Sequence, residues 1–196
     1  MRDGFLLVLS GPSGVGKGTV CEALMEGRND IKYSISDTTR KKRPMEKNGE
    51  NYNFVSLEEF QKNIEDNQYL EHAEVHGNFY GTPKKFVTES IDKGEIVILE
   101  IDVQGALQVK ENYDEAVYIF LLPPDMEELR NRIEKRSTED AETIDLRMNN
   151  AKTELTFIDK YDYGVINDSI EKTVKSIESI IEAEKLKVRS IQGVEL

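Results

Sequence analysis

The start of the chain places an unbroken apolar run directly before a glycine-rich segment. The run covers residues 5–9 (FLLVL), with no polar residue at alternate positions. Such a run is typical of a strand that is buried on both faces inside a parallel sheet. The segment after it, residues 11–19 (GPSGVGKGT), is rich in glycine, and a helix is predicted from about Lys17 to Met25. A strand, a glycine loop and a helix in this order favour an α/β fold.

Three further apolar runs support a parallel sheet. They cover residues 96–99, 117–122 and 163–166. Helical patterns lie between and after them: Leu129 and Ile133 are four residues apart in a charged stretch. An aliphatic stripe near the C-terminus consists of Ile170, Val174, Ile177 and Ile181. Strands that alternate with helices predict a parallel sheet with right-handed crossovers and helices on its faces.

The composition fits one globular domain. With 196 residues, 38% of them hydrophobic and 33% charged, the chain can bury one substantial core. No apolar run approaches the roughly 20 residues that a membrane-spanning helix needs, and the N-terminal run is too short for a signal peptide. The single cysteine, Cys21, cannot form an internal disulfide and fits a reducing compartment. We therefore expect a cytoplasmic protein that does not associate with membranes.

The net charge argues against a nucleic-acid partner. The chain carries 38 acidic and 26 basic residues, a net charge of −12, whereas affinity for a nucleic-acid backbone comes from clustered Lys and Arg. The densest basic run is residues 40–43 (RKKR). Such a run is usually a solvated surface feature, yet it could also bind a small anionic ligand.

The glycine-rich segment predicts a phosphate-binding loop. Glycine lets successive backbone N–H groups turn inward around phosphate oxygens, and the N-terminus of the following helix favours the same anion. The Lys17 ammonium can then follow the β- and γ-phosphates of ATP. The alternative, a glycine-rich turn without a ligand, is disfavoured by the strand, loop and helix context. The predicted ATP-binding residues of the loop are Gly11, Pro12, Ser13, Gly14, Val15, Gly16, Lys17, Gly18 and Thr19.

One position departs from the usual pattern of such loops. Ser or Thr normally follows the lysine, but this chain has Gly18, so Thr19, phosphate oxygens and water are expected to hold Mg²⁺. Glu100 and Asp102 follow a predicted buried strand, and acidic residues at the carboxyl end of a parallel strand beside such a loop organise Mg²⁺ and its waters. The predicted metal site therefore consists of Thr19, Glu100 and Asp102, with a structural role for Glu100 as an equal alternative.

The segment of residues 36–82 has a different pattern. The dipeptides at 48–49 (Asn-Gly) and 77–78 (Gly-Asn) are turn signals of the hairpin kind. Residues 52–55 are rich in strand formers, and residues 57–67 predict a short helix. We interpret this segment as a small antiparallel β insert carried on the parallel core.

Residues 34–54 (SISDTTRKKRPMEKNGENYNF) closely resemble the signature of the guanylate kinases. Ordered matches to that family continue at residues 70–74, 77–82, 102–105, 123–124 and 165–168. The resemblance implies transfer of the γ-phosphate of ATP to GMP or dGMP, which gives ADP and GDP and so supplies guanine nucleotides. It also implies a P-loop fold in three parts. These are a core of residues 1–35, 84–125 and 160–196, a GMP-binding insert of residues 36–83 and a helical lid region of residues 126–159.

By this resemblance, one group of residues would bind GMP. Its members are Ser36, Arg40, Arg43, Tyr52, Glu71, Tyr80, Thr82 and Asp102. The arginines and tyrosines would hold the phosphate, because guanidinium groups match pairs of phosphate oxygens and phenolic hydroxyls add donors. Ser36 and Glu71, assisted by Thr82, would bind the base, since an ionised carboxylate accepts from both N1–H and N2–H₂ of guanine.

The resemblance assigns a second group to phosphoryl transfer. Loose phosphoryl transfer needs mainly alignment and cationic stabilisation, and the catalytic residues implied are Lys17, Arg40, Arg43, Arg136 and Arg147. Arg132 also matches a lid arginine, although it could equally lie on a helix surface. Ser137 replaces a glycine usual at the lid hinge, within a polar stretch, residues 137–142, that indicates a second insert. Asn167, just after the last predicted strand, would lie near the adenine of ATP.

Several residues, and the function as a whole, also allow other interpretations. His72 and His76 are four residues apart in a predicted strand and turn, a spacing that does not align two metal ligands there. Cys21 is expected to be a core residue rather than a nucleophile. The rival functions are a non-catalytic scaffold module of the same fold, disfavoured by the retained Lys17, and a kinase for another monophosphate, disfavoured by Glu71. The oligomeric state is left open.

Overall fold

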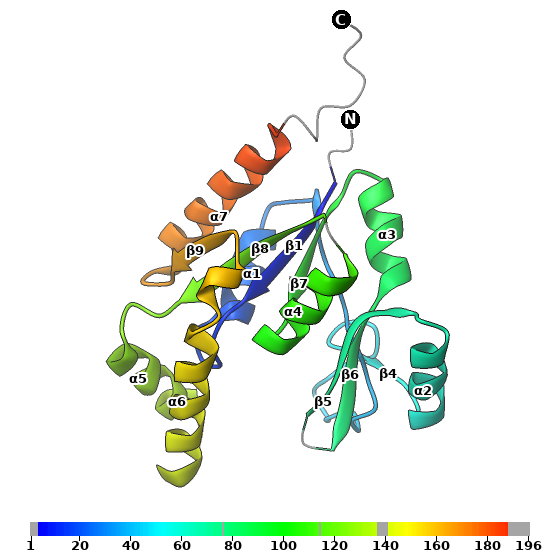
Figure 1. Ribbon diagram of the computed structural model, residues 1–196, viewed down its shortest axis with the longest axis horizontal. Helices are drawn as coiled ribbons and strands as arrows, with labels where there is room; N and C mark the ends of the chain where they lie inside the picture. The colour runs from blue at the N-terminus through cyan, green and yellow to red at the C-terminus, as the bar shows by residue number, and fades with distance from the viewer. Residues whose placement is uncertain (1–3, 76, 114, 137–140, 188–196) are drawn as a thin grey trace, which may run out of the picture.

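The computed structural model describes residues 4–75, 77–113, 115–136 and 141–187 (Figure 1). At its centre is a five-stranded parallel sheet with the strand order β2-β7-β1-β8-β9. The strands are β1 (Leu6–Ser10), β2 (Ile31–Tyr33), β7 (Ile96–Glu100), β8 (Ala116–Leu122) and β9 (Tyr163–Ile166). All four apolar runs form strands of this sheet, which confirms the predicted α/β fold.

Helices cover both faces of the parallel sheet (Figure 1). One face carries α1 (Lys17–Met25) and α7 (Ile170–Lys185), and the other carries α3 (Lys84–Asp92) and α4 (Val103–Asn112). Successive side chains of a strand point to opposite faces. Leu7 and Leu9 of β1 accordingly join one buried cluster, and Leu6 and Val8 join the other. Burial on both faces explains the absence of polar residues from this run.

Two further helices form an arm at the carboxyl end of the sheet. They are α5 (Met126–Arg136) and α6 (Ala141–Leu155), and a short 3-10 turn, Ile158–Lys160, leads from them back towards β9. Leu129 and Ile133 pack α5 against the core: both are fully buried in the cluster that contains Leu7. The stretch 137–140, with the predicted hinge position Ser137, lies outside the described residues.

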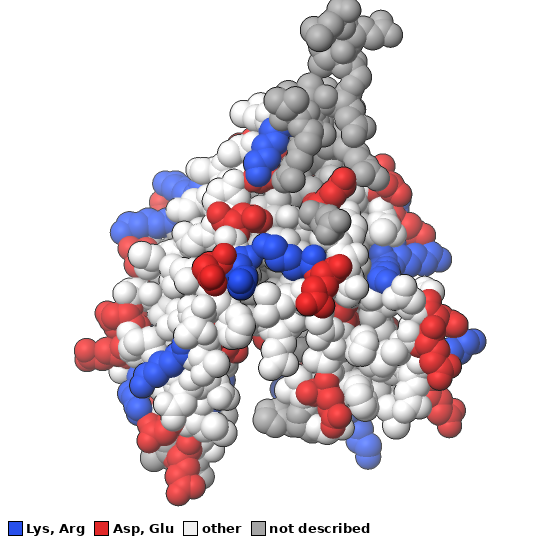
Figure 2. Space-filling model, in the orientation of Figure 1, with Lys and Arg blue, Asp and Glu red and all other residues white. Residues whose placement is uncertain are grey.

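A second sheet projects from the same end of the core on the other side. Its strands are β3 (Asp37–Thr38), β4 (Asn53–Phe54), β5 (Tyr69–Val75) and β6 (Asn78–Pro83), in the order β4-β3-β6-β5, and α2 (Leu57–Glu65) packs beside it. The space-filling view shows a notch between this insert and the arm of α5 and α6 (Figure 2). Two projecting parts therefore flank the carboxyl ends of the parallel strands.

The insert was predicted, but its sheet is mixed rather than antiparallel. Gly77, with a φ of 73°, lies in the turn between the antiparallel strands β5 and β6, as expected. The hairpin predicted at residues 48–49 does not form, because β3 and β4 pair in parallel. The long connection of residues 39–52 lets the chain return in the same direction, and Gly49 makes only a local bond in which its N–H donates to the Tyr52 carbonyl at 2.9 Å.

The insert has an aromatic core of its own. Phe60 of α2 is fully buried and stacks on Tyr69, with the ring centroids 4.7 Å apart. The centroid of the Phe79 ring lies 5.6 Å from that of Phe60. Phe60 belongs to neither buried cluster of the main sheet. The Tyr69 hydroxyl donates to Asp37 Oδ2 at 2.8 Å and so connects β5 to β3. Burial raises the pKa of the Asp37 carboxyl.

Two smaller expectations are also confirmed. Cys21 is buried in the core, and this burial raises the pKa of its thiol. Ile177 and Ile181 of the C-terminal stripe are fully buried, with Ile170 and Val174 packed against the same cluster. Within the part of the chain that the structure describes, no helix has both the length and the apolar character needed to cross a bilayer.

We predict that Phe60→Ala destabilises the insert locally. Removing this buried ring should cost about 3–5 kcal/mol, because the surroundings of a deleted core side chain relax only partly. Amide hydrogen exchange should accelerate in α2, β5 and β6 and stay slow in β1 and β8. Phe60→Leu is the matched control and should cost at most about 1.5 kcal/mol. Equal loss of protection in both sheets would contradict a separate aromatic core.

Candidate active site

The loop between β1 and α1 has a backbone that favours glycine at three positions. Gly11, Gly14 and Gly16 have φ angles of 143°, 86° and 104°, a region that other residues rarely adopt. A Cβ at Gly14 would lie 2.7 Å from Ile133 Cγ1, and a Cβ at Gly16 would lie 2.7 Å from Asn167 Nδ2. Side chains from α5 and from the segment after β9 therefore pack directly against a bare backbone.

Three carbonyls of the loop accept hydrogen bonds from side chains. Lys17 Nζ donates to the Gly11 carbonyl at 2.6 Å and to the Pro12 carbonyl at 3.3 Å. The Val15 carbonyl accepts from Asn167 Nδ2 at 2.8 Å and from Arg132 at 3.2 Å. α1 begins at Lys17 with no side-chain cap and no acidic residue in its first turn. Its N-terminal N–H groups are therefore suited to an anion.

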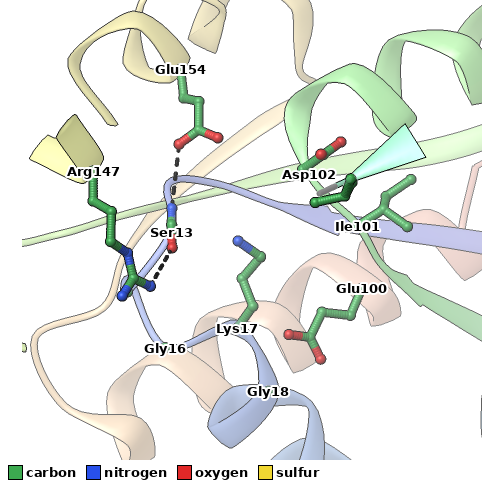
Figure 3. A pocket seen from close by; sticks show the side chains of 11 residues that line it. Ser13, Gly16, Lys17, Gly18, Glu100, Ile101, Asp102, Arg147 and Glu154 are labelled. Carbon is green, nitrogen blue, oxygen red and sulfur yellow. Dashed lines mark hydrogen bonds between the residues drawn. The ribbon is translucent and has the colours of Figure 1, made fainter. Parts of the chain in front are cut away.

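A hollow of about 450 Å³ lies beside the loop (Figure 3). Its lining consists of Ser13, Gly14, Gly16, Lys17, Gly18, Val75, Glu100, Ile101, Asp102, Arg147 and Glu154. The structure thus brings together the loop, two predicted metal-site acids and one predicted lid arginine. Burial lowers the pKa of Lys17, and the carboxylates of Glu100, Glu154 and Asp102 oppose that effect.

Glu100 and Asp102 have the chemistry of a hydrated magnesium site. Glu100 Oε2 accepts from the Tyr33 hydroxyl at 3.0 Å, and Asp102 Oδ1 accepts from the Gly105 N–H at 2.8 Å, so each carboxylate is oriented. Mg²⁺ is usually bound by one or two carboxylates together with phosphate oxygens and waters. No set of three or more His, Cys, Asp or Glu side chains gathers as a metal site among the described residues. This donor set fits Mg²⁺ that is bound together with nucleotide phosphates.

Thr19 lies apart from this hollow. It is exposed on α1, where it lines a different surface hollow with Glu22 and Glu26. Successive helical residues turn by about 100°, and it is Gly18 that faces Glu100, with its Cβ position 3.5 Å from both carboxylate oxygens. The structure does not bring Thr19 to the predicted metal site.

A buried carboxylate of the insert lies near Gly105, as does Asp102 of the hollow. Glu71 of β5 is 6% exposed, and the Thr82 hydroxyl donates to its Oε1 at 2.6 Å. Burial raises the pKa of Glu71 to about 7, against the effect of the Thr82 hydrogen bond. A Cβ at Gly105 would lie 3.1 Å from Glu71 Oε2 and 3.4 Å from Asp102 Oδ1. This glycine lets the predicted base-binding acid and the predicted metal-site acid approach one backbone position. Ser36 is half-buried, just before β3.

Arg40 lies in an aromatic and acidic environment. Its guanidinium carbon lies 5.5 Å from the centroid of the Tyr52 ring, and the Tyr52 and Tyr80 rings are 5.8 Å apart. Both oxygens of Glu46 accept from Arg40, at 2.7 Å and 3.1 Å, and this bonding raises the pKa of Arg40 and lowers that of Glu46. Glu46 also accepts from the backbone N–H of Arg43 at 2.8 Å, while the Arg43 side chain is exposed.

The predicted lid arginines differ in their surroundings. Arg147 of α6 donates to the Ser13 hydroxyl at 3.0 Å. Arg132 is not simply a helix-surface residue: besides Val15, it donates to Glu128 at 2.8 Å and to the Asn167 carbonyl at 3.0 Å. Arg136 ends α5, and its side chain lies outside the described part of the chain. Arg147 is therefore the described lid arginine that lines the hollow.

Asn167 lies beneath the loop rather than on an open surface. Its side chain is 2% exposed, and its Oδ1 accepts from the Thr173 hydroxyl at 3.0 Å. Together with the bond from Nδ2 to Val15, this places the amide between α7 and the loop. The described geometry supports a role in holding the loop, and the expected neighbourhood of adenine stays a prediction.

A family model described as guanylate kinase matches residues 4–184 of the chain. The chain belongs to the guanylate kinase family. It is 53% identical to a guanylate kinase of Clostridium tetani over 98% of this chain and 92% of the relative, and 54% identical to one of Caldanaerobacter subterraneus subsp. tengcongensis over 95% and 91%. A crystal structure of guanylate kinase from Anaplasma phagocytophilum is 39% identical, covers 97% of this chain and 91% of its own, and has a TM-score of 0.79.

Two carboxylates of this guanylate kinase family member were not assigned a role from the sequence. Glu46 pairs with Arg40, and Glu154 of α6 accepts from the Ser13 N–H at 3.3 Å. Glu46 belongs to the matched signature and follows Arg43 by three residues, a spacing that could have drawn attention to it. Glu154 lies in a charged helix 141 positions from its partner, and no local pattern distinguishes it from a solvated acid. His72, by contrast, is exposed, and His76 lies outside the described residues.

We predict that Asn167→Ala weakens ATP binding without affecting GMP binding. The substitution removes one donor from the Val15 carbonyl and one acceptor of the Thr173 hydroxyl, which also donates to the Ser169 carbonyl at 2.9 Å. Because Arg132 still donates to Val15, the lost hydrogen bond costs about 0.5–1.5 kcal/mol, and steady-state kinetics should show a KM for ATP raised up to roughly tenfold with an unchanged KM for GMP. Thr173→Val, which keeps the amide on the loop, should shift the KM for ATP less. An unchanged KM for ATP in Asn167→Ala would contradict the loop-holding role.

Proposed function

We propose that this chain transfers the γ-phosphate of ATP to GMP, giving ADP and GDP, with dGMP as an alternative acceptor. The observation that carries the proposal is the position of Glu71: this buried carboxylate lies close to Gly105, as does Asp102, which lines the phosphate-loop hollow. A phosphate loop alone fits many nucleotide enzymes. A buried carboxylate near Asp102 in addition favours a ligand that offers hydrogen-bond donors. We propose that the protein acts in the cytoplasm.

Guanine has the hydrogen-bonding groups that this carboxylate needs. Its N1–H and N2–H₂ are adjacent donors, and one ionised carboxylate can accept from both. Adenine has an unprotonated N1 and no 2-amino group, so it would offer Glu71 neither of these donors, and hydrogen bonds left unmade in a buried site cost roughly 1–3 kcal/mol or more. Thr82 donates to Oε1 and holds the group in place. We assign Ser36 to O6 of the base. None of these contacts uses the ribose 2′-hydroxyl, so dGMP should also be accepted.

The Arg40 environment supports a phosphate site at the other end of GMP. The guanidinium already binds two oxygens of Glu46 in the geometry that a phosphate would offer. Tyr52 and Tyr80 lie next to each other there and supply phenolic donors. In our proposal, the GMP phosphate binds Arg40, Arg43 and both tyrosines and competes with Glu46 for Arg40.

Transfer itself requires alignment and positive charge rather than a general base, because the acceptor phosphate is already anionic. We assign this charge to Lys17 and Arg147 in the hollow, and to Arg136. Mg²⁺ held through water by Glu100 and Asp102 would neutralise charge on the ATP phosphates. Closure of the insert and the α5–α6 arm across the notch would exclude water that otherwise hydrolyses ATP.

A rival from another class is a scaffold module that binds peptides and not nucleotides. The features that such a module does not need are all present here: Lys17 donates within the loop, Glu71 is buried, and Arg40 lies among aromatic rings. A kinase for another monophosphate would need a different partner at Glu71. These observations favour GMP kinase activity over both rivals.

We predict that ADP release with ATP·Mg²⁺ depends on the identity of the acceptor. GMP and dGMP should be turned over with a kcat/KM at least roughly a hundredfold above that of AMP, CMP and UMP, since donors on the base are recognised by a buried acceptor. Lys17→Ala should abolish turnover, with little change in the melting temperature. Comparable turnover of AMP and GMP would contradict the assignment of Glu71, and turnover of neither would favour the scaffold.

We further predict a pH dependence that reports on Glu71. Burial raises its pKa to about 7, so acid favours the protonated carboxyl, which cannot accept two donors. The kcat/KM for GMP should level off above about pH 7 and fall about tenfold per pH unit below it. The GMP phosphate adds a second titration near pH 6. Glu71→Gln is the matched control: it should keep the phosphate titration and lose the one near 7. Identical profiles would exclude Glu71.

A further inference from the structure

Ser13 of the phosphate loop is bonded twice by the same helix (Figure 3). Arg147 donates to the Ser13 hydroxyl at 3.0 Å, and the Ser13 backbone N–H donates to Glu154 Oε2 at 3.3 Å. Both partners belong to α6 and are seven residues apart, which is about two helical turns, so they lie on one helix face. The loop therefore contacts α6 at two points of a single residue.

A carboxylate at this place has an electrostatic cost. Glu154 lines the hollow together with Glu100 and Asp102, so it is a third acid beside a site for polyphosphate. Burial raises the pKa of the Glu154 carboxyl, while its bond to Ser13 and the charge of Lys17 lower it. The proposed phosphate and base contacts do not include Glu154. Its position therefore calls for a role other than ligand binding.

The hydrogen bonds of one peptide unit in the loop indicate what Glu154 does there. The peptide between Pro12 and Ser13 has its carbonyl bonded to Lys17 Nζ at 3.3 Å and to the Val15 N–H at 3.2 Å. Its N–H is bonded to Glu154. With both ends bonded, the peptide plane cannot rotate without breaking these contacts. Glu154 of α6 thus helps to fix the orientation of the peptide whose carbonyl accepts from the Lys17 ammonium.

We propose that Glu154 is a positioning residue for phosphoryl transfer. By accepting from Ser13, it seats α6 on the loop so that Arg147, two turns earlier on the same face, reaches the hollow beside Lys17. The role requires an acceptor at this place rather than a negative charge. The inference rests on the proposed kinase activity and deepens it, since it names the contact that sets the lid arginine relative to the loop.

The test compares Glu154→Ala with Glu154→Gln, which keeps an acceptor and removes the charge. Glu154→Ala should lower kcat at least about tenfold with KM for GMP within about twofold, because small misplacements of catalytic groups cost rate more than binding. Glu154→Gln should remain within about threefold of the wild-type kcat. Glu142→Ala removes an exposed acid from the same helix and should match the wild type.

A second readout does not depend on turnover. In the nucleotide-free protein, amide hydrogen exchange at Ser13 should be slow in the wild type and in Glu154→Gln and faster in Glu154→Ala. Three outcomes would overturn the proposal: an unchanged kcat in Glu154→Ala, a Glu154→Gln variant as impaired as Glu154→Ala, or ATP binding that tightens in both. The last outcome would mean that the carboxylate competes with phosphate. Wild-type turnover of GMP in the same assay separates failure of this inference from failure of the proposed function.

Discussion

A loop can offer its N–H groups to an anion only if its carbonyls turn elsewhere, and buried carbonyls need donors of their own. Here the donors come from distant parts of the chain. The Val15 carbonyl accepts from Asn167, which follows β9, and from Arg132 of α5. The carbonyls of Gly11 and Pro12 accept from Lys17, the residue that is expected to bind the phosphates. The shape of one short loop therefore depends on the helical arm and on the edge of the sheet.

The parallel sheet explains why the other functional groups meet at the same place. Leu9 of β1 pairs with Glu100 of β7, so the loop after one strand and the acids after the other begin side by side. Gly105 then leaves space between Asp102 and Glu71 of the insert. Missing side chains at Gly16, Gly18 and Gly105 allow the three parts of the site to approach one another. Glycines therefore determine how closely the polar side chains of the candidate site approach one another.

The sequence predicted what depends on local pattern. The apolar run of β1 and the start and end of α1 follow from periodicity and glycine placement, and the structure confirms them. The turn signal at residues 48–49 does not produce a hairpin, because such a signal bends the chain without specifying which strands will pair. Helical geometry could have shown that Gly18 and Thr19 face different ways.

Other features were beyond local pattern because they depend on contacts between distant segments. Nothing near Asn167 indicates that its amide lies under the loop, and nothing near Glu154 separates it from the solvated acids of α6. Both are recognised only when β9 and α6 have been placed against residues 12–15. The ion pair of Arg40 with Glu46 spans six residues but depends on a loop whose course the sequence does not specify. Partners that support the candidate site from distant segments are therefore harder to find in the sequence than the residues of the loop itself.

We propose that this protein binds GMP through Glu71 and Arg40 and so presents the GMP phosphate to the loop. The most direct measurement is a crystal structure with GMP and a non-hydrolysable ATP analogue. We expect both oxygens of Glu71 to accept from N1–H and N2–H₂ of guanine at about 2.7–3.0 Å, the GMP phosphate to bind Arg40 in competition with Glu46, and the γ-phosphate to lie between Lys17 and Arg147. Guanine bound away from Glu71, or GMP bound with the Arg40–Glu46 pair unchanged and no phosphate contact to Arg40, would contradict this claim.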